Sequence, residues 1–339
     1  MKSEEIYNSI KNQIIEKKYQ LGDRLPTEFD LMNEYNVGRS TIREVLTSLT
    51  SEGIIEKRHG LGSYVTRVPA YKGTICICVR FENLISSTVW YPTLIKSINT
   101  YAKNKGYDTI IAVGYGQSIK EIKESIDAYF RKPFSKEIVA IVNTMAYDMG
   151  KMDVPVINFS AIIPYGDNAI YIDYNEIFIK AKELFKEKGY DNPAIIYTED
   201  SIQKAGNQQF EHLKKLADSW TDKESLKIKS YDYEDTFIKF KEWYESPKRS
   251  NALFIQDDGI LDNIIPYLYM NNVKIPEDLA IITFANTHKK FNYPAEFYRF
   301  GSDHDRTAKI LLECLDKLLK GESVGVIKLS PIYIPGNSL

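Results

Sequence analysis

Apolar residues recur with a helical period in the first fifty residues of the chain. Ile6, Ile10 and Ile14 are spaced four residues apart and predict one apolar stripe of a first helix. A second helix is predicted from Thr27, a residue suited to an N-cap, with the acidic Asp30 three places further on. The residues of this helix expected to face inward are Leu31, Met32 and Tyr35.

A third helix and a hairpin complete this first part. The helix is predicted from about Arg39 to Ser51, with Gly53 as its stop signal. Its predicted core face holds Ile42, Val45, Leu46 and Leu49. Its predicted solvent face holds Arg39, Ser40, Arg43 and Thr47. Two β-rich runs, 54–58 and 63–66, are joined by His59-Gly60-Leu61-Gly62 and predict a β-hairpin.

This order of elements predicts a winged helix-turn-helix, a DNA-binding fold. Arginine reads guanine edges or clamps phosphates, and the hydroxyls of Ser40 and Thr41 can reach phosphate oxygens near the start of a helix. Glycines at positions 60 and 62 let the hairpin backbone approach a sugar-phosphate chain closely. Two arginines one turn apart are, taken alone, more often a solvated helix face. The prediction therefore rests on the combination of elements.

Several motifs within residues 5–67 resemble the GntR family of bacterial transcription regulators. They are Leu21-Gly-Asp-x-Leu-Pro-Thr-Glu28, Asn36-Val-Gly-Arg-Ser-Thr-Ile-Arg-Glu-Val-Leu46 and Gly60-Leu-Gly-Ser-Tyr-Val65. The resemblance implies DNA contacts from the third helix and the wing tip, and we add Thr47 and His59 from the same surfaces. The predicted DNA-binding residues are Arg39, Ser40, Thr41, Arg43, Thr47, His59, Gly60 and Gly62.

The sequence departs from the family pattern at two places. Family members usually carry an arginine after the glutamate of the second helix, where this chain has Phe29. They usually carry a serine before the arginine that opens the third helix, where this chain has Gly38, a poorer side-chain cap. The first departure removes a DNA contact, so the operator sequence is expected to differ from those of relatives.

From Gly73 onward, continuous apolar runs alternate with amphipathic helices. The predicted strand runs are 74–79, 109–113, 137–142, 155–159, 193–197, 228–231, 252–255 and 279–283, and a loop is expected from Arg80 to Pro92. This alternation predicts an α/β fold with parallel sheets covered on both faces. Roughly 265 residues are many for one sheet, so two similar lobes are expected. The predicted boundaries are 1–68 for the winged helix-turn-helix, 69–73 for a linker and 74–339 for the bilobal doubly wound domain.

The larger part is similar to the effector-binding domain of the LacI/GalR family. The resemblance is carried by Ala252-Leu-Phe-Ile-Gln-Asp-Asp-Gly259 and Met270-Asn-Asn-Val-Lys-Ile-Pro-Glu-Asp-Leu-Ala-Ile-Ile-Thr-Phe284. It implies a type I periplasmic-binding-protein-like fold with a ligand cleft between two lobes. A GntR-type end joined to such a domain resembles the arabinose-repressor group, whose members respond to sugars.

Candidate ligand contacts follow the strands, since ligands of open α/β sheets bind outside the carboxyl ends of the strands. The predicted ligand-binding residues are Phe81, Glu82, Trp90, Tyr91, Ser160, Asn207, Asp257, Asn286 and Arg299. Sugars need charged hydrogen-bonding groups with an aromatic floor. The alternatives are that the aromatic residues belong to the core, that Asp257 or Asp258 caps a helix, and that Arg299 pairs with an acid. The arginine that the LacI/GalR resemblance leads one to expect near 205 is not evident.

Composition narrows the remaining classes of function. The 339 residues are 43% hydrophobic and 27% charged, with a net charge of −2, as in an ordinary soluble protein. Three cysteines are too few for a disulfide framework, and Cys76 and Cys78 are expected to be buried filler on one face of a strand. We find no secretory leader, apolar membrane run, metal-ligand spacing, phosphate loop or nucleophile motif. A cytoplasmic protein without metal or cofactor, and not an enzyme, is expected.

The sequence thus predicts a regulator that represses carbohydrate-utilisation genes as a homodimer on operator DNA. Its expected effector is a monosaccharide or its phosphate. One alternative is a different polar effector such as a nucleoside. Less favoured are a DNA-binding end fused to an enzyme, which would need a much longer chain, and a sugar-binding transport protein, which would need a leader peptide.

Overall fold

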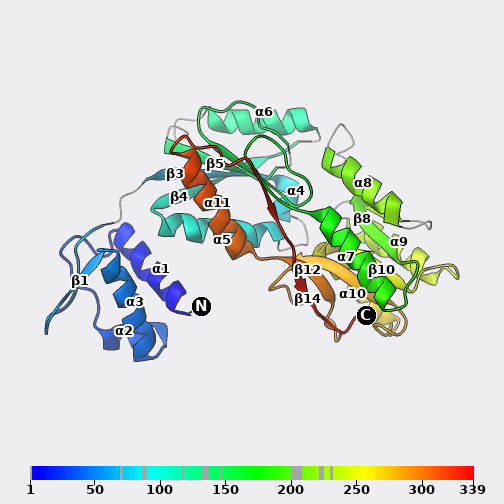
Figure 1. Ribbon diagram of the computed structural model, residues 1–339, viewed down its shortest axis with the longest axis horizontal. Coiled ribbons are helices and arrows are strands. Elements are labelled where there is room, and N and C mark those ends of the chain that lie inside the picture. The colour runs from blue at the N-terminus through cyan, green and yellow to red at the C-terminus, as the bar shows by residue number, and fades with distance from the viewer. Residues whose placement is uncertain are drawn as a thin grey trace. The chain divides into compact units, whose positions relative to one another are not determined.

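The computed structural model describes residues 2–68, 72–85, 90–116, 118–131, 137–145, 147–199, 208–220, 225–229 and 232–339 (Figure 1). Its contacts divide the chain into two units, Met1–Ile75 with Asn99–Ile110, and Cys76–Ile98 with Ile111–Leu339. The domain boundaries at 68 and 74 remain a prediction. Residues 69–71 of the predicted linker lie outside the described residues.

Three helices with one apolar core form the first part of the chain. They are α1 (Lys2–Ile15), α2 (Glu28–Tyr35) and α3 (Arg39–Ser51). The predicted stripe of α1 is confirmed, because Ile6, Ile10 and Ile14 are buried in one cluster with Leu31 of α2 and Ile42 of α3. Burial of one isoleucine side chain contributes about 1.5–3 kcal/mol. These three residues therefore fix α1 against the other two helices.

Single residues set the ends of α2 and the start of α3. The Thr27 hydroxyl accepts a hydrogen bond from the Asp30 amide, and the Asp30 carboxylate accepts one from the Thr27 amide at 3.0 Å. This capping box confirms the predicted helix start. Asn36 takes a left-handed conformation with φ 50° and ends α2. Gly38 precedes α3 and makes no side-chain cap, as its lack of a side chain requires.

The wing is an antiparallel pair of strands, β1 (Ile55–Arg58) and β2 (Gly62–Val65). Gly60 and Gly62 at its turn have φ of +72° and +110°, a region that L-residues with side chains rarely adopt. A Cβ atom on Gly62 would also lie 2.8 Å from Nε of Arg24. The hairpin is confirmed, and its turn depends on glycine for both reasons.

The first of two six-stranded sheets has the strand order β13-β7-β6-β5-β3-β4. Its strands are β3 (Gly73–Arg80), β4 (Tyr107–Gly114), β5 (Ile138–Asn143), β6 (Val156–Ser160), β7 (Ala169–Ile172) and β13 (Val326–Leu329). The pairs β5–β6, β6–β7 and β7–β13 are parallel. All eight residues of β3 are buried, as expected for a strand inside a sheet covered on both faces.

The second sheet has the order β14-β12-β11-β10-β8-β9. Its strands are β8 (Ala194–Glu199), β9 (Leu226–Lys229), β10 (Ala252–Ile255), β11 (Ala280–Asn286), β12 (Tyr298–Ser302) and β14 (Ile332–Ile334). Its pairs are parallel except β12–β14, which is antiparallel. Two mainly parallel sheets confirm the predicted bilobal α/β fold.

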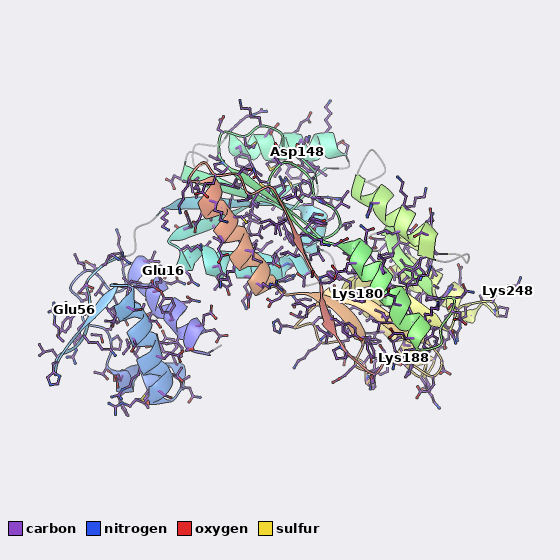
Figure 2. All side chains as sticks on the ribbon, viewed as in Figure 1. Glu16, Glu56, Asp148, Lys180, Lys188 and Lys248 are labelled. Atoms are coloured by element: carbon purple, nitrogen blue, oxygen red, sulfur yellow. The ribbon has the colours of Figure 1, made fainter. Side chains whose placement is uncertain are left out.

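Helices cover both sheets. They are α4 (Phe81–Ile85), α5 (Trp90–Asn104), α6 (Ile119–Phe130), α7 (Tyr174–Glu187), α8 (Gln208–Trp220), α9 (Tyr233–Glu245), α10 (Asp258–Met270) and α11 (His304–Leu318). Helix α7 is typical, since Phe178 and Phe185 are buried whereas Lys180 and Lys188 project to solvent (Figure 2). The predicted loop over 80–92 is wrong, because α4 follows β3 directly and α5 begins at Trp90. The apolar run of a strand carries no signal for a helix directly after it, so α4 was not predicted.

Three described segments cross from one sheet to the other. They are the β7–α7 junction, the β12–α11 junction and the connection from β13 to β14. Helix α11 follows a strand of the second sheet yet packs on β6 of the first. Helix α7 follows a strand of the first sheet, and its Phe178 packs on Phe254 of β10 in the second. The two lobes are therefore each built from separate stretches of the sequence.

Candidate functional site

An exposed pair of arginines lies on α3. Arg39 and Arg43 are 65% and 58% exposed in their side chains, and both guanidinium groups contact the carboxylate of Glu28 on α2. Nε of Arg39 donates to Oε2 at 2.8 Å, and Nε of Arg43 donates at 3.2 Å. The hydrogen bond from Arg39 is the main reason that the pKa of Glu28 lies below its usual range. Glu28 thus holds the two predicted DNA contacts side by side.

The other predicted residues of α3 lie on or beside this surface. Ser40 and Thr47 are exposed, and Thr41 is half-buried. The hydroxyl of Thr47 donates to the carbonyl of Arg43 at 2.7 Å, a bond within the helix. Helical spacing predicted these positions, whereas the role of Glu28 needed the tertiary contact between α2 and α3.

The wing carries a further cationic side chain, Arg58, next to the predicted residues of its turn. His59 and Gly60 at its turn are exposed. Arg58, which the sequence analysis did not select, stacks 4.4 Å from the ring centroid of Tyr64 and contacts Glu56 at 2.5 Å. An arginine held on an aromatic ring is suited to a phosphate contact. Its position next to the predicted His59 was the available signal.

In the first lobe, which is built on the first sheet, strand β3 ends in a buried arginine. The second lobe is built on the second sheet. Arg80 is 4% exposed, and its Nε lies 3.4 Å from Oε2 of Glu82. The predicted contact Glu82 is therefore in an ion pair with the strand end. Phe81, between them, is 46% exposed and points away from the core. The two neighbours that we predicted as one ligand-binding loop thus have different surroundings.

Trp90 and Tyr91 begin α5 inside an aromatic cluster. Trp90 is 6% exposed, stacks on Phe159 of β6 at 5.8 Å between ring centroids, and meets His304 edge-on at 4.8 Å. Burial raises the pKa of Tyr91 to about 12, although the charge of Arg80 acts in the opposite direction. One face of Trp90 is thus occupied by Phe159, as the alternative of a core residue expected.

Polar residues end the neighbouring strands of the first lobe. Asn143 is fully buried, and its amide donates to the carbonyl of Tyr147 and to Oδ1 of Asn158, both at 2.9 Å. The predicted contact Ser160 is 4% exposed, and its hydroxyl accepts from the amide of Ile162 at 3.1 Å. These groups shape the loops after β5 and β6.

In the second lobe, Gln256, Asp257 and Asp258 follow β10. Oε1 of Gln256 accepts from the amide of Thr198 at 2.7 Å and thereby joins the ends of β8 and β10. Asp257 caps α10 by accepting from the amide of Ile260 at 2.9 Å. Burial, reinforced by the charge of Asp258, raises the pKa of Asp257 to about 7. The helix-cap alternative holds for Asp257, a residue that is half-buried as a whole.

Asn286 at the end of β11 pairs with a buried histidine. Its amide donates to Nδ1 of His304 at 2.6 Å, and its Oδ1 accepts from the amide of His288 at 2.8 Å. His304 is 2% exposed, and its Nε2 has no hydrogen-bond partner among the described residues. Burial lowers the pKa of His304 to about 3. The ring is therefore neutral at pH 7, with a hydrogen on the unpaired Nε2. The sequence pattern around His304 does not predict this pairing, and His304 was not among the predicted contacts.

Arg299 holds the loop after β11. Its guanidinium donates to the carbonyl of Lys289 at 2.5 Å and to that of Thr287 at 3.2 Å. Burial lowers its pKa, whereas Glu296 and Asp258 act in the opposite direction. The structure thus gives Arg299 a role within its own lobe. The predicted contact Asn207 lies outside the described residues.

Contacts between the two lobes bring part of the predicted set together. Trp90 on the first lobe meets His304, which bonds Asn286 of the second lobe. Tyr174, which follows β7, donates to the carbonyl of Gln256 at 3.3 Å. Burial, together with the charges of Asp257 and Asp258, raises the pKa of Tyr174. The first set of contacts thus joins aromatic, imidazole and amide groups, and the second places Tyr174 near the charges of Asp257 and Asp258.

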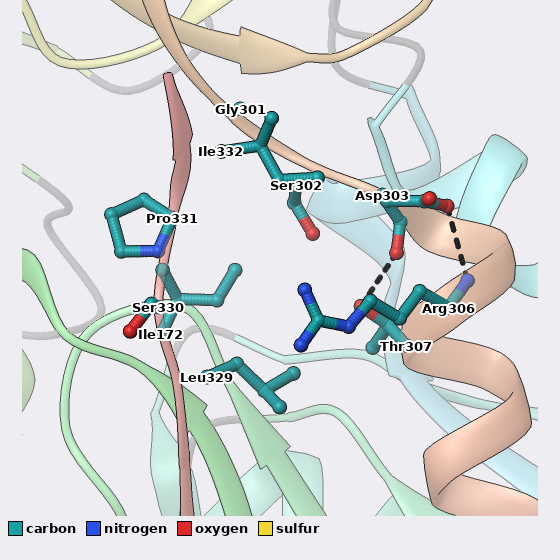
Figure 3. Close-up of a pocket in the computed structure, with 10 residues that line it drawn as sticks. All are labelled: Ile172, Gly301, Ser302, Asp303, Arg306, Thr307, Leu329, Ser330, Pro331 and Ile332. Atoms are coloured by element: carbon teal, nitrogen blue, oxygen red, sulfur yellow. Dashed lines mark hydrogen bonds between the residues drawn. The ribbon is translucent and has the colours of Figure 1, made fainter.

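A separate hollow lies among the three crossing segments (Figure 3). Its empty volume is about 280 Å³, the open mouth included. It is lined by Ile172, Gly301, Ser302, Asp303, Arg306, Thr307, Leu329, Ser330, Pro331 and Ile332. Asp303 caps α11 by accepting from the amides of Asp305 and Arg306, both at 3.0 Å. The segments that connect the two lobes therefore line this hollow.

The described part of the chain offers neither a metal-binding cluster nor a membrane-spanning helix. It holds no cluster of three histidine, cysteine or acidic side chains placed to bind a metal ion. None of its helices is long and apolar enough to span a membrane. Cys76 and Cys78 are buried with their sulfurs 3.9 Å apart, which confirms that they share one face of β3.

The fold and these surfaces define the class of protein, a winged helix-turn-helix joined to a bilobal α/β domain. Residues 2–65 match the model for bacterial regulatory proteins of the gntR family. The N-terminal part of this chain is therefore a GntR-type domain. Among solved structures, the Lac repressor bound to ONPG superposes with a TM-score of 0.65 at 12% identity, covering 89% of this chain and 92% of that chain. The transcription regulator CcpA of Lactococcus lactis gives a TM-score of 0.60 at 17% identity, over 78% and 97%.

Two curated relatives match much of the chain. The arabinose metabolism transcriptional repressor of Geobacillus stearothermophilus is 20% identical over 303 residues, which are 83% of this chain and 80% of that protein. The ribose operon repressor of Lactococcus lactis subsp. lactis is 20% identical over 252 residues, 74% of each chain. The predicted resemblance to GntR-type and LacI-type regulators is confirmed.

Proposed function

We propose that this protein is a sequence-specific DNA-binding regulator that represses carbohydrate-utilisation genes and is controlled by a sugar. The observation that carries the DNA-binding half is the exposed pair Arg39 and Arg43, held by Glu28 within a GntR-type domain. Arginine forks on an exposed recognition helix read guanine edges or clamp phosphates. Relatives named as arabinose and ribose repressors support the regulatory role.

The protein binds operator DNA as a homodimer in this proposal. Two copies place their α3 helices in successive major grooves, so the operator has two related half-sites about one helical turn apart. Arg39, Arg43 and Thr47 face the bases, while Ser40 and Thr41 contact phosphates near the start of α3. His59, Gly60, Gly62 and Arg58 bring the wing against the backbone of the DNA. The association is salt-dependent because bound phosphates release counterions.

The effector binds between the two lobes, at the carboxyl ends of their strands. Its recognition groups are Asp257, Asn286, His304 and Trp90, with Nε2 of His304 as an unused hydrogen-bond donor. Such a set suits the hydroxyls of a monosaccharide. A LacI family regulator from Arthrobacter in complex with lactose, with a TM-score of 0.60 to this chain at 14% identity over 79% of it and 99% of that chain, supports a sugar.

In this proposal the segments that cross between the two lobes act as a hinge, and this hinge couples effector binding to DNA binding. A ligand that contacts both lobes stabilises one arrangement of them, and three crossing segments transmit the change. Coupling between two sites of one protein is typically about 1–3 kcal/mol. The α/β domain acts by binding in this proposal, and we assign it no catalytic step.

Two measurements on the full chain test the proposal. Random duplex DNA is selected for binding, and the recovered sequence is measured by fluorescence anisotropy with and without single sugars. We expect a two-fold symmetric sequence, and one pentose, hexose or sugar phosphate that changes its affinity about 5- to 150-fold. No enrichment of any sequence would refute DNA recognition. An enriched sequence with no response to any sugar would refute the sugar assignment alone.

A further inference from the structure

Phe29 is an exposed aromatic side chain that follows Glu28, the residue that holds the arginine pair of the GntR-type domain. It is 68% exposed and is absent from the apolar cluster that the three helices share. The other side chains of the first turn of α2 are engaged. Glu28 binds Arg39 and Arg43, Asp30 caps the helix, and Leu31 is buried. Phe29 and Asp30 are both exposed, but Asp30 is bonded to Thr27, so Phe29 is the exposed apolar side chain of this turn.

The position of Phe29 is fixed, although its ring packs on nothing in the core. It is the second residue of a helix whose start is closed by a capping box. The preceding residue is anchored to α3, since the Glu28 carboxylate lies 2.8 Å from Nε of Arg39. The backbone that carries the ring is therefore held next to the recognition helix. A solvated phenylalanine adds little to folding stability, so folding does not explain its presence here.

The chemistry of the major groove indicates what an apolar ring on this surface would recognise. Each base pair presents hydrogen-bonding groups there, and thymine alone adds an apolar group, its C5 methyl. Arginine, the neighbour on this surface, reads guanine instead. An apolar ring on the residue that follows Glu28, the partner of both arginines, therefore suits a site in which a thymine lies close to the bases that the arginines contact.

We propose that Phe29 is a specificity-determining residue that contacts the C5 methyl of one thymine in each operator half-site. This inference rests on the proposed function, because it requires α3 to lie in the major groove. It replaces the arginine contact that the GntR resemblance implies at this position of α2 by an apolar contact with a different base preference. It also predicts that the chain prefers thymine over cytosine at that position, since cytosine lacks the methyl group.

The test combines a change in the DNA with a change in the protein. The operator recovered by selection is resynthesised with uracil in place of each thymine in turn, which removes the methyl alone. Dissociation constants are measured for the wild-type full chain, Phe29→Ala and the control Leu21→Ala. Leu21 is similarly exposed, at 67%, but precedes α2 and lies outside its first turn.

We expect one thymine per half-site whose replacement weakens wild-type binding about fourfold, the value of one buried methyl-sized group. The same replacement should leave Phe29→Ala unaffected and should weaken Leu21→Ala as much as the wild type. Selection with Phe29→Arg should recover guanine where the wild type recovers thymine.

Each contrary outcome has a distinct meaning. Wild-type affinity that no uracil replacement changes overturns the inference without the need for any variant. A methyl effect that persists in Phe29→Ala overturns it as well, because another residue then makes the contact. If Phe29→Ala fails to fold, Phe29→Leu is measured in its place. Leucine is also apolar, so the inference then requires that uracil replacement weaken the binding of Phe29→Leu as much as that of the wild type. Failure of the wild type to select any sequence would instead refute the proposed function.

Discussion

Asp257 and His304 give the α/β domain two opposite dependences on pH. The folded protein keeps a proton on Asp257 up to about pH 7, whereas an ordinary aspartate releases it near 3.8. The folded protein therefore binds more protons than the unfolded chain between these values. The stability that this group contributes is full below about pH 4 and is lost as the pH rises to 7, by about 1.4 kcal/mol per pH unit. The total is at most about 4 kcal/mol.

His304 acts in the other direction. Its folded pKa of about 3 lies below the ordinary value of 6.5, so the folded protein disfavours the charged ring. Its contribution is full above pH 6.5 and is lost as the pH falls toward 3, again by about 1.4 kcal/mol per pH unit. Between about pH 4 and 6.5 the stability lost through Asp257 as the pH rises is offset by the stability gained through His304. Replacing one of the two residues should therefore expose the slope of the other.

Asp257→Asn and His304→Gln separate these contributions. Asparagine still caps a helix, so Asp257→Asn preserves the start of α10. Urea unfolding is followed by tryptophan fluorescence at several pH values between about 4 and 8. Trp90, Trp220 and Trp243 are the three tryptophans of the chain, so the signal comes from its larger part.

The free energy of unfolding of Asp257→Asn should rise with pH relative to the wild type, up to about pH 7. That of His304→Gln should fall relative to the wild type from about pH 4 to 6.5. Stability differences that do not vary with pH would refute the burial argument for the residue concerned.

Four further measurements address the DNA-binding part. Arg43→Ala should weaken operator binding about 5- to 150-fold, as expected for a lost base contact, and leave sugar binding unchanged in calorimetry; equal operator affinity would contradict the contact. Arg58→Ala should lower the slope of log affinity against log salt by about one, and an unchanged slope would argue against a phosphate contact from the wing. Glu28→Gln should change the unfolding free energy by less than about 1 kcal/mol, because its partners are exposed, yet reduce the ratio of operator to random-DNA affinity. Thr27→Ala should cost about 1 kcal/mol and speed amide exchange in α2, whereas unchanged exchange would contradict the capping role.

Local signals made much of the fold predictable from the sequence. The four-residue spacing of Ile6, Ile10 and Ile14 predicted the buried face of α1, since helical geometry places such residues on one side. Thr27 with Asp30 predicted a helix start, because capping depends on residues three apart. Continuous apolar runs predicted parallel strands, which need apolar residues on both faces. Each of these depends on neighbours within a few positions.

Other features depend on residues that are distant in sequence. Nothing near Glu28 indicates that it holds Arg39 and Arg43, since the packing of α2 on α3 brings them together. His304 and Asn286 become a pair because a crossing segment carries the chain from β12 to α11. The aromatic surroundings of Trp90, and the carbonyls that hold Arg299, likewise follow from tertiary packing.

The sequence alone therefore determined the classes of element, the GntR-type resemblance and the outward face of α3, because periodicity and caps are local properties. Tertiary structure decided which polar groups are buried, which are paired and which titrate abnormally. Those properties depend on desolvation and on charges from other elements, which no local pattern contains. For this protein, local pattern therefore identified candidate contact residues, and tertiary structure defined their burial, their partners and their titration.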